Sequence, residues 1–155
     1  MKRFTIVDII EATGGQPIGA EIERSLALEL KEVGIDSRIL RAGALFFALQ
    51  GETYNGHDFV AEALSKGAVG VVVSRQWAEA NREVLGGMRL AVLVDDTLRA
   101  FQACARYYRS LFSIPVVAVT GTNGKTTTKD MIAALLSKDA RLLAEYSHRA
   151  PSRIR

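Results

Sequence analysis

The residues best suited to chemistry stand in one polar loop that follows an apolar run. The loop reads Thr120-Gly121-Thr122-Asn123-Gly124-Lys125-Thr126-Thr127. Its two glycines permit a tight turn whose backbone N–H groups can point at one anion. A helix that begins at the lysine adds its positive N-terminal end. The combination predicts that these eight residues bind ATP, with Lys125 as the catalytic residue at the β- and γ-phosphates and Thr126 as the Mg²⁺ ligand.

The loop departs from the strict phosphate-loop pattern at one position. The pattern G-x-x-x-x-G-K-[ST] requires glycine at position 119, where this chain has Val119. A Gly-Lys-Thr sequence also arises by chance in ordinary turns, so an isolated match would carry little weight. Here an apolar run, two glycines and a helical pattern follow one another in the order that a phosphate site needs, which favours the nucleotide interpretation.

Strand-like and helix-like patterns alternate along the chain, which predicts an α/β fold with mainly parallel strands. The run Ala44–Leu49 is apolar throughout, as expected of a strand covered on both faces. A polar stretch ending in Gly86-Gly87 indicates a boundary between a small domain, 1–85, and the beginning of a phosphate-loop domain, 86–148. The expected strands are 33–36, 44–49, 69–73, 90–94 and 116–119, and the expected helices are 5–12, 58–66, 95–112 and 125–137.

Composition narrows the classes of function. The 155 residues include 20 Lys/Arg and 17 Asp/Glu, but they form no basic run that would indicate nucleic-acid binding. There is no apolar stretch of the ~20 residues that a membrane helix needs, and no signal peptide. We therefore expect a cytoplasmic monomer without nucleic-acid or membrane partners. Cys104, the single cysteine, lies in an apolar helical stretch, and we interpret it as a small buried hydrophobe rather than a catalytic thiol.

Two separate motifs resemble those of the Mur ligases, which are ATP-dependent amide ligases of peptidoglycan precursor synthesis. The loop described above is similar to their phosphate loop. Asp36-Ser37-Arg38 and the following run, 43–51, are similar to their D-[ST]-R and G-x-L-F-x-A-[LI]-x-G segments. Asn55-Gly56-His57-Asp58-Phe59 and Lys129-Asp130-Met131 look most like the MurF branch of the family. The resemblance extends over about residues 5–145.

The resemblance implies a reaction and its substrates. In the MurF branch, ATP converts the terminal carboxylate of UDP-N-acetylmuramoyl-tripeptide to an acyl phosphate, which the amine of D-alanyl-D-alanine attacks. The first domain would bind the UDP part through Ser37, Arg38, Gly51, Asn55 and Gly56. Arg38 could instead form a surface ion pair with a neighbouring acid. For His57, capping the next helix, packing beside the sheet and touching substrate all stay open.

The resemblance stops near residue 148. The last residues, 149–155, do not follow the family pattern, and the family's later segments are missing from the sequence. We therefore expect a truncated or frameshifted product, or a deliberate fragment, that is inactive alone. Two alternative functions stay open. One is a UDP-precursor-binding module without catalysis, and the other is the diamino-acid-adding Mur ligase.

Overall fold

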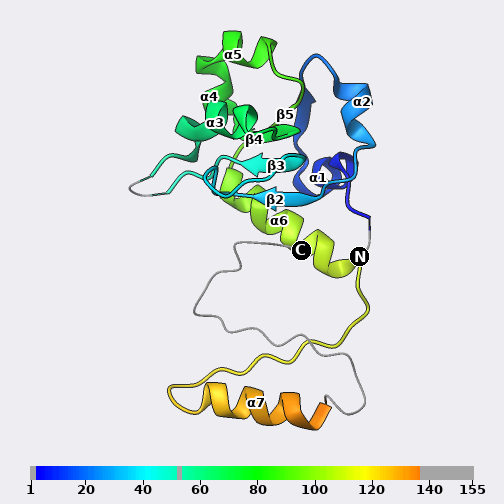
Figure 1. Cartoon of the computed structure of the whole chain (residues 1–155), viewed down its shortest axis with the longest axis vertical. Helices are drawn as coiled ribbons and strands as arrows, with labels where there is room; N and C mark the ends of the chain where they lie inside the picture. The colour runs from blue at the N-terminus through cyan, green and yellow to red at the C-terminus, as the bar shows by residue number, and fades with distance from the viewer. Residues whose placement is uncertain (1–2, 52–53, 137–155) are drawn as a thin grey trace. The chain divides into compact units, whose positions relative to one another are not determined.

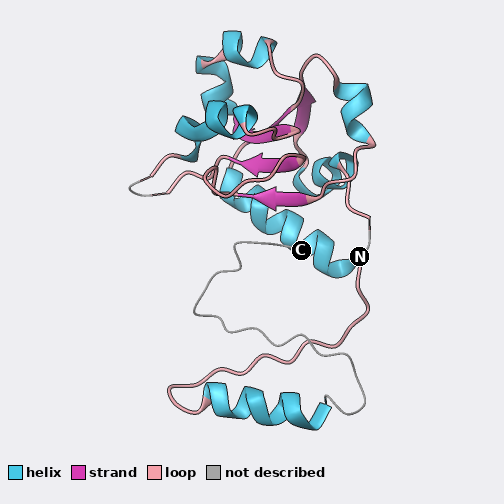
Figure 2. Ribbon diagram, viewed as in Figure 1, coloured by secondary structure: helices cyan, strands magenta, loops and turns pink. Residues whose placement is uncertain are grey.

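A five-stranded sheet forms the centre of the first part of the chain. The computed structural model describes residues 3–51 and 54–136, and these divide into two units, one up to Phe112 and one from Ser113 (Figure 1). The strand order is β1-β5-β4-β3-β2, and all neighbours are parallel except β1, which runs antiparallel to β5 (Figure 2). The strands are β1 (Gln16–Ile18), β2 (Glu32–Gly34), β3 (Ala44–Phe47), β4 (Gly70–Ser74) and β5 (Ala91–Val94). The predicted α/β class with mainly parallel strands is confirmed.

Helices cover both faces of this sheet. The first face packs on α1 (Ile6–Thr13) and α6 (Thr97–Ser110). The second packs on α3 (Val60–Ser65), α4 (Arg75–Ala80) and α5 (Arg82–Gly86). Along the chain, a short helix, α2 (Ile22–Leu26), follows β1 and precedes β2. A 3-10 turn, η1 (Gly56–Phe59), leads into α3.

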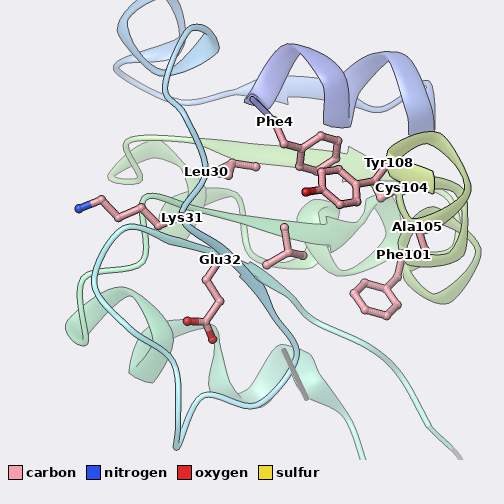
Figure 3. A pocket seen from close by; sticks show the side chains of 9 residues that line it. Phe4, Leu30, Lys31, Glu32, Phe101, Cys104, Ala105 and Tyr108 are labelled. Carbon is pink, nitrogen blue, oxygen red and sulfur yellow. The ribbon is translucent and has the colours of Figure 1, made fainter. Parts of the chain in front are cut away.

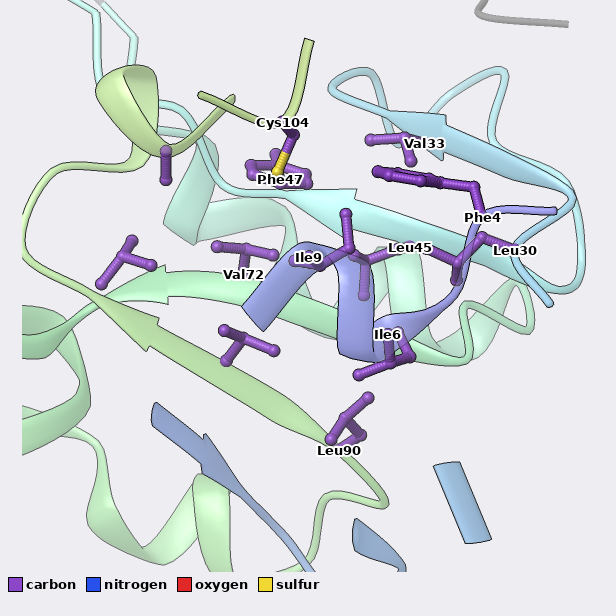
Figure 4. Packing of buried hydrophobic residues seen from close by; sticks show 13 residues of the cluster. Phe4, Ile6, Ile9, Leu30, Val33, Leu45, Phe47, Val72, Leu90 and Cys104 are labelled. Carbon is purple, nitrogen blue, oxygen red and sulfur yellow. The ribbon is translucent and has the colours of Figure 1, made fainter. Parts of the chain in front are cut away.

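The apolar run of β3 shows how the sequence specifies this layered arrangement. Leu45 and Phe47 belong to the core on the α1 and α6 side, where Figure 4 shows them, and Ala44 and Phe46 belong to the core on the other side. All four side chains are fully buried. Because successive strand residues point to opposite faces, only a run without polar residues can be buried on both.

Two helix starts occur where the sequence predicts them. Thr5 and Asp8 form a capping box at the start of α1, and Gly14 ends that helix with a φ of 64°. The Asp96 side chain accepts a hydrogen bond from the Arg99 backbone N–H at the start of α6. These caps satisfy N–H groups that the first helical turn leaves without partners.

The division between the units differs from the expected boundary at residue 85. Strand β5 pairs with both β1 and β4, and α6 packs against α1, so both elements belong to the first unit. Strand β1 was not predicted. It is a three-residue edge strand that contains Pro17, and a proline is tolerated in a sheet mainly at such an edge.

The second unit contains α7 (Lys125–Leu136), close to the predicted helix 125–137. The predicted strand 116–119 is not formed, and the described residues of the second unit contain no other strand that could accept its hydrogen bonds. Val116 and Val117 are 66% and 64% exposed. The prediction for the tail 149–155 concerns residues outside the described part.

Candidate functional site

The turn Asp36–Arg38 leaves the carboxyl end of β2 and carries two of the predicted substrate residues. The Arg38 guanidinium donates from Nε and Nη2 to the two carboxylate oxygens of Asp36, at 2.9 and 2.8 Å. Its side chain is 80% exposed. The Asp36 carboxylate raises the pKa of Arg38 and the guanidinium lowers the pKa of Asp36, so both groups stay charged. The structure therefore shows the ion pair that the sequence left open, with the guanidinium still facing solvent.

Ser37, the second residue of this turn, points inward. It is 1% exposed, and its hydroxyl donates to Glu62 Oε2 of α3 at 2.8 Å. Lys66 donates to Glu62 Oε1 at 2.7 Å and to the Ser37 carbonyl at 2.9 Å. The sequence motif singled out neither Glu62 nor Lys66. Their spacing of four residues on a predicted helix was the available signal, because side chains so spaced lie on one helical face.

The loop after β3 carries the other three predicted substrate residues. The Gly51 N–H donates to the Tyr54 carbonyl at 2.7 Å, and the Gly56 N–H donates to the Leu49 carbonyl at the same distance. A Cβ atom on Gly56 would lie 2.6 Å from the backbone N and O of Leu49. Glycine is therefore required at this position for close packing of two backbone segments.

The His57 ring connects this loop to the sheet through one contact from each of its two nitrogens. Its Nδ1 lies 2.8 Å from Asn55 Oδ1, and its Nε2 accepts a hydrogen bond of 3.0 Å from the Ser74 backbone N–H at the end of β4. These partners assign the ring proton to Nδ1. The ring is 4% exposed and stacks on Trp77. Of the three roles left open for His57, the structure shows packing beside the sheet, together with capping by Asn55 rather than by the histidine.

Acidification is expected to weaken the hydrogen bond between His57 and Ser74. Burial lowers the pKa of His57 from its usual 6.5, so the folded state favours the neutral ring. The neutral ring therefore contributes its full stabilisation of the fold above pH 6.5, the pKa of an unperturbed histidine. This contribution is lost as the pH falls through the lowered pKa of His57 in the folded state. Protonation removes the acceptor for Ser74, and we expect a loss of about 1 to 3 kcal/mol in the free energy of unfolding.

Urea unfolding between pH 7.5 and 5 measures this loss. In a His57→Gln variant the amide oxygen can still accept from Ser74 but does not titrate. Its unfolding free energy should change less over the same range. Equal pH dependence in both proteins would show that His57 is not the titrating group.

The two loops lie at the same edge of the sheet. Strands β2 and β3 are parallel neighbours and their arrows point the same way (Figure 2), so the turn 36–38 and the loop 51–56 both follow carboxyl ends. Tyr54 is 49% exposed and stacks on Phe59 at 5.0 Å between ring centroids. In parallel sheets, ligands bind in the crevice outside such carboxyl ends.

The second unit holds the phosphate loop as an exposed turn that leads into α7. Gly121 and Gly124 have φ angles of 153° and 77°. The Lys125 ammonium donates to the Gly121 carbonyl and lies 3.5 Å from the Thr122 carbonyl. The side chains of the loop threonines and of Asn123 are exposed.

These features fit a nucleotide phosphate. Both glycines adopt the left-handed backbone region that other residues avoid, and nothing lies within 4 Å of the place of a Gly124 Cβ. The helix start and the ammonium supply positive charge. The described residues contain no group of three or more His, Cys, Asp or Glu that could hold a metal. A Mg²⁺ ion at Thr126 would therefore depend on nucleotide phosphates for further ligands, which is common for this ion.

A pocket elsewhere in the first unit contains none of the predicted site residues. Figure 3 shows it between β2 and α6, with mostly apolar side chains around Cys104. Burial raises the pKa of Cys104 to about 12, so the thiol stays protonated at neutral pH. Its interpretation as a buried hydrophobe is confirmed. Within residues 3–51 and 54–136, no helix has the length and apolar composition needed to cross a membrane.

Comparison with known proteins gives related ligases of two branches. The UDP-N-acetylmuramoyl-tripeptide--D-alanyl-D-alanine ligase of Synechocystis is 44% identical over 111 residues, which are 72% of this chain and 23% of the relative. The UDP-N-acetylmuramoyl-L-alanyl-D-glutamate--2,6-diaminopimelate ligase of Geobacter metallireducens is 41% identical over 120 residues, or 77% of this chain and 22% of the relative. The chain thus spans about a quarter of the length of the curated relatives it matches.

Solved structures agree with these relatives. MurF from Acinetobacter baumannii matches with a TM-score of 0.73 at 29% identity, over 91% of this chain and 29% of that one. MurF ligase from Thermotoga maritima in complex with ADP matches with a TM-score of 0.55 at 34% identity, over 69% and 23%.

Two family models match in succession. The Mur ligase middle domain matches residues 119–151, and so reaches into the segment 149–155 that we expected to lie outside the family. The model of the Mur ligase family, catalytic domain, matches residues 29–109, more than half of the sequence, and the chain therefore belongs to the Mur ligase family.

Proposed function

We propose that this chain carries the UDP-substrate site and the phosphate loop of an ATP-dependent ligase that adds D-alanyl-D-alanine to UDP-N-acetylmuramoyl-tripeptide. One observation supports this most strongly. The two Mur ligase models match one after the other, and each match contains one of the two candidate sites. Residues 1–85 would form most of the substrate domain. Residues 86–148 would complete it and begin the nucleotide domain.

The UDP part would bind at the carboxyl edge of β2 and β3, along Ser37, Arg38, Gly51, Asn55 and Gly56. Arg38 presents a guanidinium that can donate two parallel hydrogen bonds to a phosphate. The Asn55 side-chain oxygen is taken by His57, and its NH₂ group can still donate to a uracil carbonyl. Polar groups on two neighbouring loops thus supply donors for both ends of a uridine diphosphate.

The phosphates of ATP would bind along the loop Thr120–Thr127. Lys125 and the backbone N–H groups at the start of α7 would neutralise their charge, and the Thr126 hydroxyl would hold Mg²⁺. Bound ATP and Mg²⁺ supply an activated phosphoryl group for the substrate carboxylate. The similarity to a ligase structure in complex with ADP supports a nucleotide as a ligand.

Sequence features favour the D-alanyl-D-alanine branch over the diamino-acid branch. The similarity to a diaminopimelate ligase at 41% identity keeps that second branch as a candidate. The segments 55–59 and 129–131 and the similarity to MurF structures support the first. A module that binds the UDP precursor without catalysis is a further candidate. It is favoured by the five-stranded sheet of the first unit and by the run 116–119, which pairs with no strand among the described residues of the second unit.

Nucleotide binding to the 155-residue chain tests the phosphate-loop assignment. We expect a fluorescent ATP analogue with Mg²⁺ to bind, and Lys125→Met to weaken that binding about fivefold, since an exposed charge contact contributes about 1 kcal/mol. Lys129→Met, on the same helix, is the matched control. We expect no ADP release above background with both substrates present. Turnover would contradict that expectation, and nucleotide binding unchanged by Lys125→Met would contradict the loop assignment.

A further inference from the structure

A closed set of hydrogen bonds ties the turn after β2 to helix α3. The Ser37 hydroxyl donates to one oxygen of Glu62, and the Lys66 ammonium donates to the other, at 2.8 and 2.7 Å. The same ammonium donates to the Ser37 carbonyl at 2.9 Å. The set therefore begins and ends on Ser37 and passes through two side chains one helical turn apart.

These bonds occupy Ser37 and leave Arg38 for a ligand. The Ser37 hydroxyl proton is directed at Glu62, and its carbonyl is directed at Lys66, so neither faces solvent. Arg38 follows directly and its side chain is 80% exposed. Asp36 binds one edge of the guanidinium, and Nη1 makes no hydrogen bond within the described part of the chain. The closed set holds Ser37 in place, and it thereby fixes the direction in which the neighbouring Arg38 side chain extends from the backbone.

We propose that Glu62 and Lys66 are positioning residues of the UDP site. They act through Ser37 to present Arg38 to the diphosphate, and they need not touch the ligand. This inference rests on the proposed function, because it assumes that a uridine diphosphate binds beside Arg38. It also gives Ser37 a role as an anchor rather than as a donor to the substrate.

The exposure of Glu62 and Lys66 allows a positioning role to be distinguished from a role in folding stability. The side chains of Lys66 and Glu62 are 37% and 38% exposed, and ion pairs of such exposure add little to folding stability. Hydrogen bonds from Lys66 and Ser37 lower the pKa of Glu62, so the carboxylate stays ionised and offers two acceptors at neutral pH. Loss of the pair should therefore change ligand binding more than it changes the melting temperature.

Calorimetric titration of the full 155-residue chain with uridine diphosphate tests this. Glu62→Gln removes the negative charge: its NH₂ group can still donate to the Ser37 hydroxyl oxygen, but the neutral amide oxygen holds the Lys66 ammonium by a weaker hydrogen bond. We expect the dissociation constant to rise about five- to tenfold in Glu62→Gln and Lys66→Met, with melting temperatures within about 3 °C of the wild type. Lys66→Arg keeps the cation and should bind within about twofold of the wild type. Glu79→Gln, an exposed acid on α4, is the matched control.

A second readout follows the turn without ligand. The Arg38 backbone N–H donates to Asp36 Oδ1 at 3.0 Å, and its exchange with solvent should be at least about fivefold faster in Glu62→Gln. If the wild type binds uridine diphosphate and both Glu62→Gln and Lys66→Met bind it equally well, the positioning role alone is overturned. If the wild type does not bind it, the substrate assignment fails and this inference fails with it.

Discussion

Replacing Arg38 with alanine is expected to weaken binding of UDP-N-acetylmuramoyl-tripeptide by about 10- to 100-fold. Hydrogen bonds between a guanidinium and a phosphate are charge-assisted, and each contributes about 1.5 to 3 kcal/mol. The loss of one such bond corresponds to this change in affinity. The fold should not change, because the side chain is 80% exposed and bonds only to Asp36 among the described residues. Isothermal titration calorimetry measures the affinity, and urea unfolding measures the stability.

Two further variants control this experiment. Arg38→Lys keeps the charge but cannot form two parallel bonds, so it should recover only part of the affinity. Arg24→Ala removes an exposed arginine on α2 and should bind as the wild type does. Wild-type affinity in Arg38→Ala would remove this residue from the substrate site.

Gly56→Ala is expected to disturb both stability and binding. The added Cβ would lie 2.6 Å from the backbone N and O of Leu49, and 2.9 Å from the Ala48 carbonyl carbon. These are backbone atoms directly after β3, which cannot move aside as a flexible side chain could, so we expect a loss of about 2 to 3 kcal/mol in the free energy of unfolding. The displaced loop carries Asn55, and binding of the UDP precursor should fall at least about tenfold.

Gly86→Ala is the control for the effect of an added methyl group. Nothing lies within 4 Å of the place of its Cβ, and it stands at the end of α5. Its free energy of unfolding should stay within about 0.5 kcal/mol of the wild type. A Gly56→Ala protein that is as stable as the Gly86→Ala protein would contradict the close packing of residues 49 and 56.

Local patterns were sufficient for most elements of the first unit. The helix at Thr5 and the strand at Ala44 were predicted because a capping residue and a continuous apolar run are signals contained within one segment. Strand β1 was not predicted because its partner, β5, lies more than 70 residues away and its central residue is a proline. The strand 116–119 was predicted from its valines, but a strand also needs a neighbour for its backbone hydrogen bonds.

The candidate site was predicted in part for the same reason. The motif identified Ser37 and Arg38 but could not show that Ser37 faces inward, because its partner Glu62 lies 25 residues later. His57 was ambiguous because its role depends on the Ser74 backbone, 17 residues away. A motif names the residues of a site, whereas long-range hydrogen bonds decide which of them face a ligand.

Calorimetric titration of the chain with UDP-N-acetylmuramoyl-tripeptide tests the central claim most directly. The first unit contains a five-stranded sheet with a buried core on each face, and it carries all of the proposed UDP-site residues. We predict saturable binding at one site that uridine diphosphate displaces and that Arg38→Ala weakens. A chain that is folded by circular dichroism but does not bind the precursor would contradict the assignment of this unit as the UDP-substrate site.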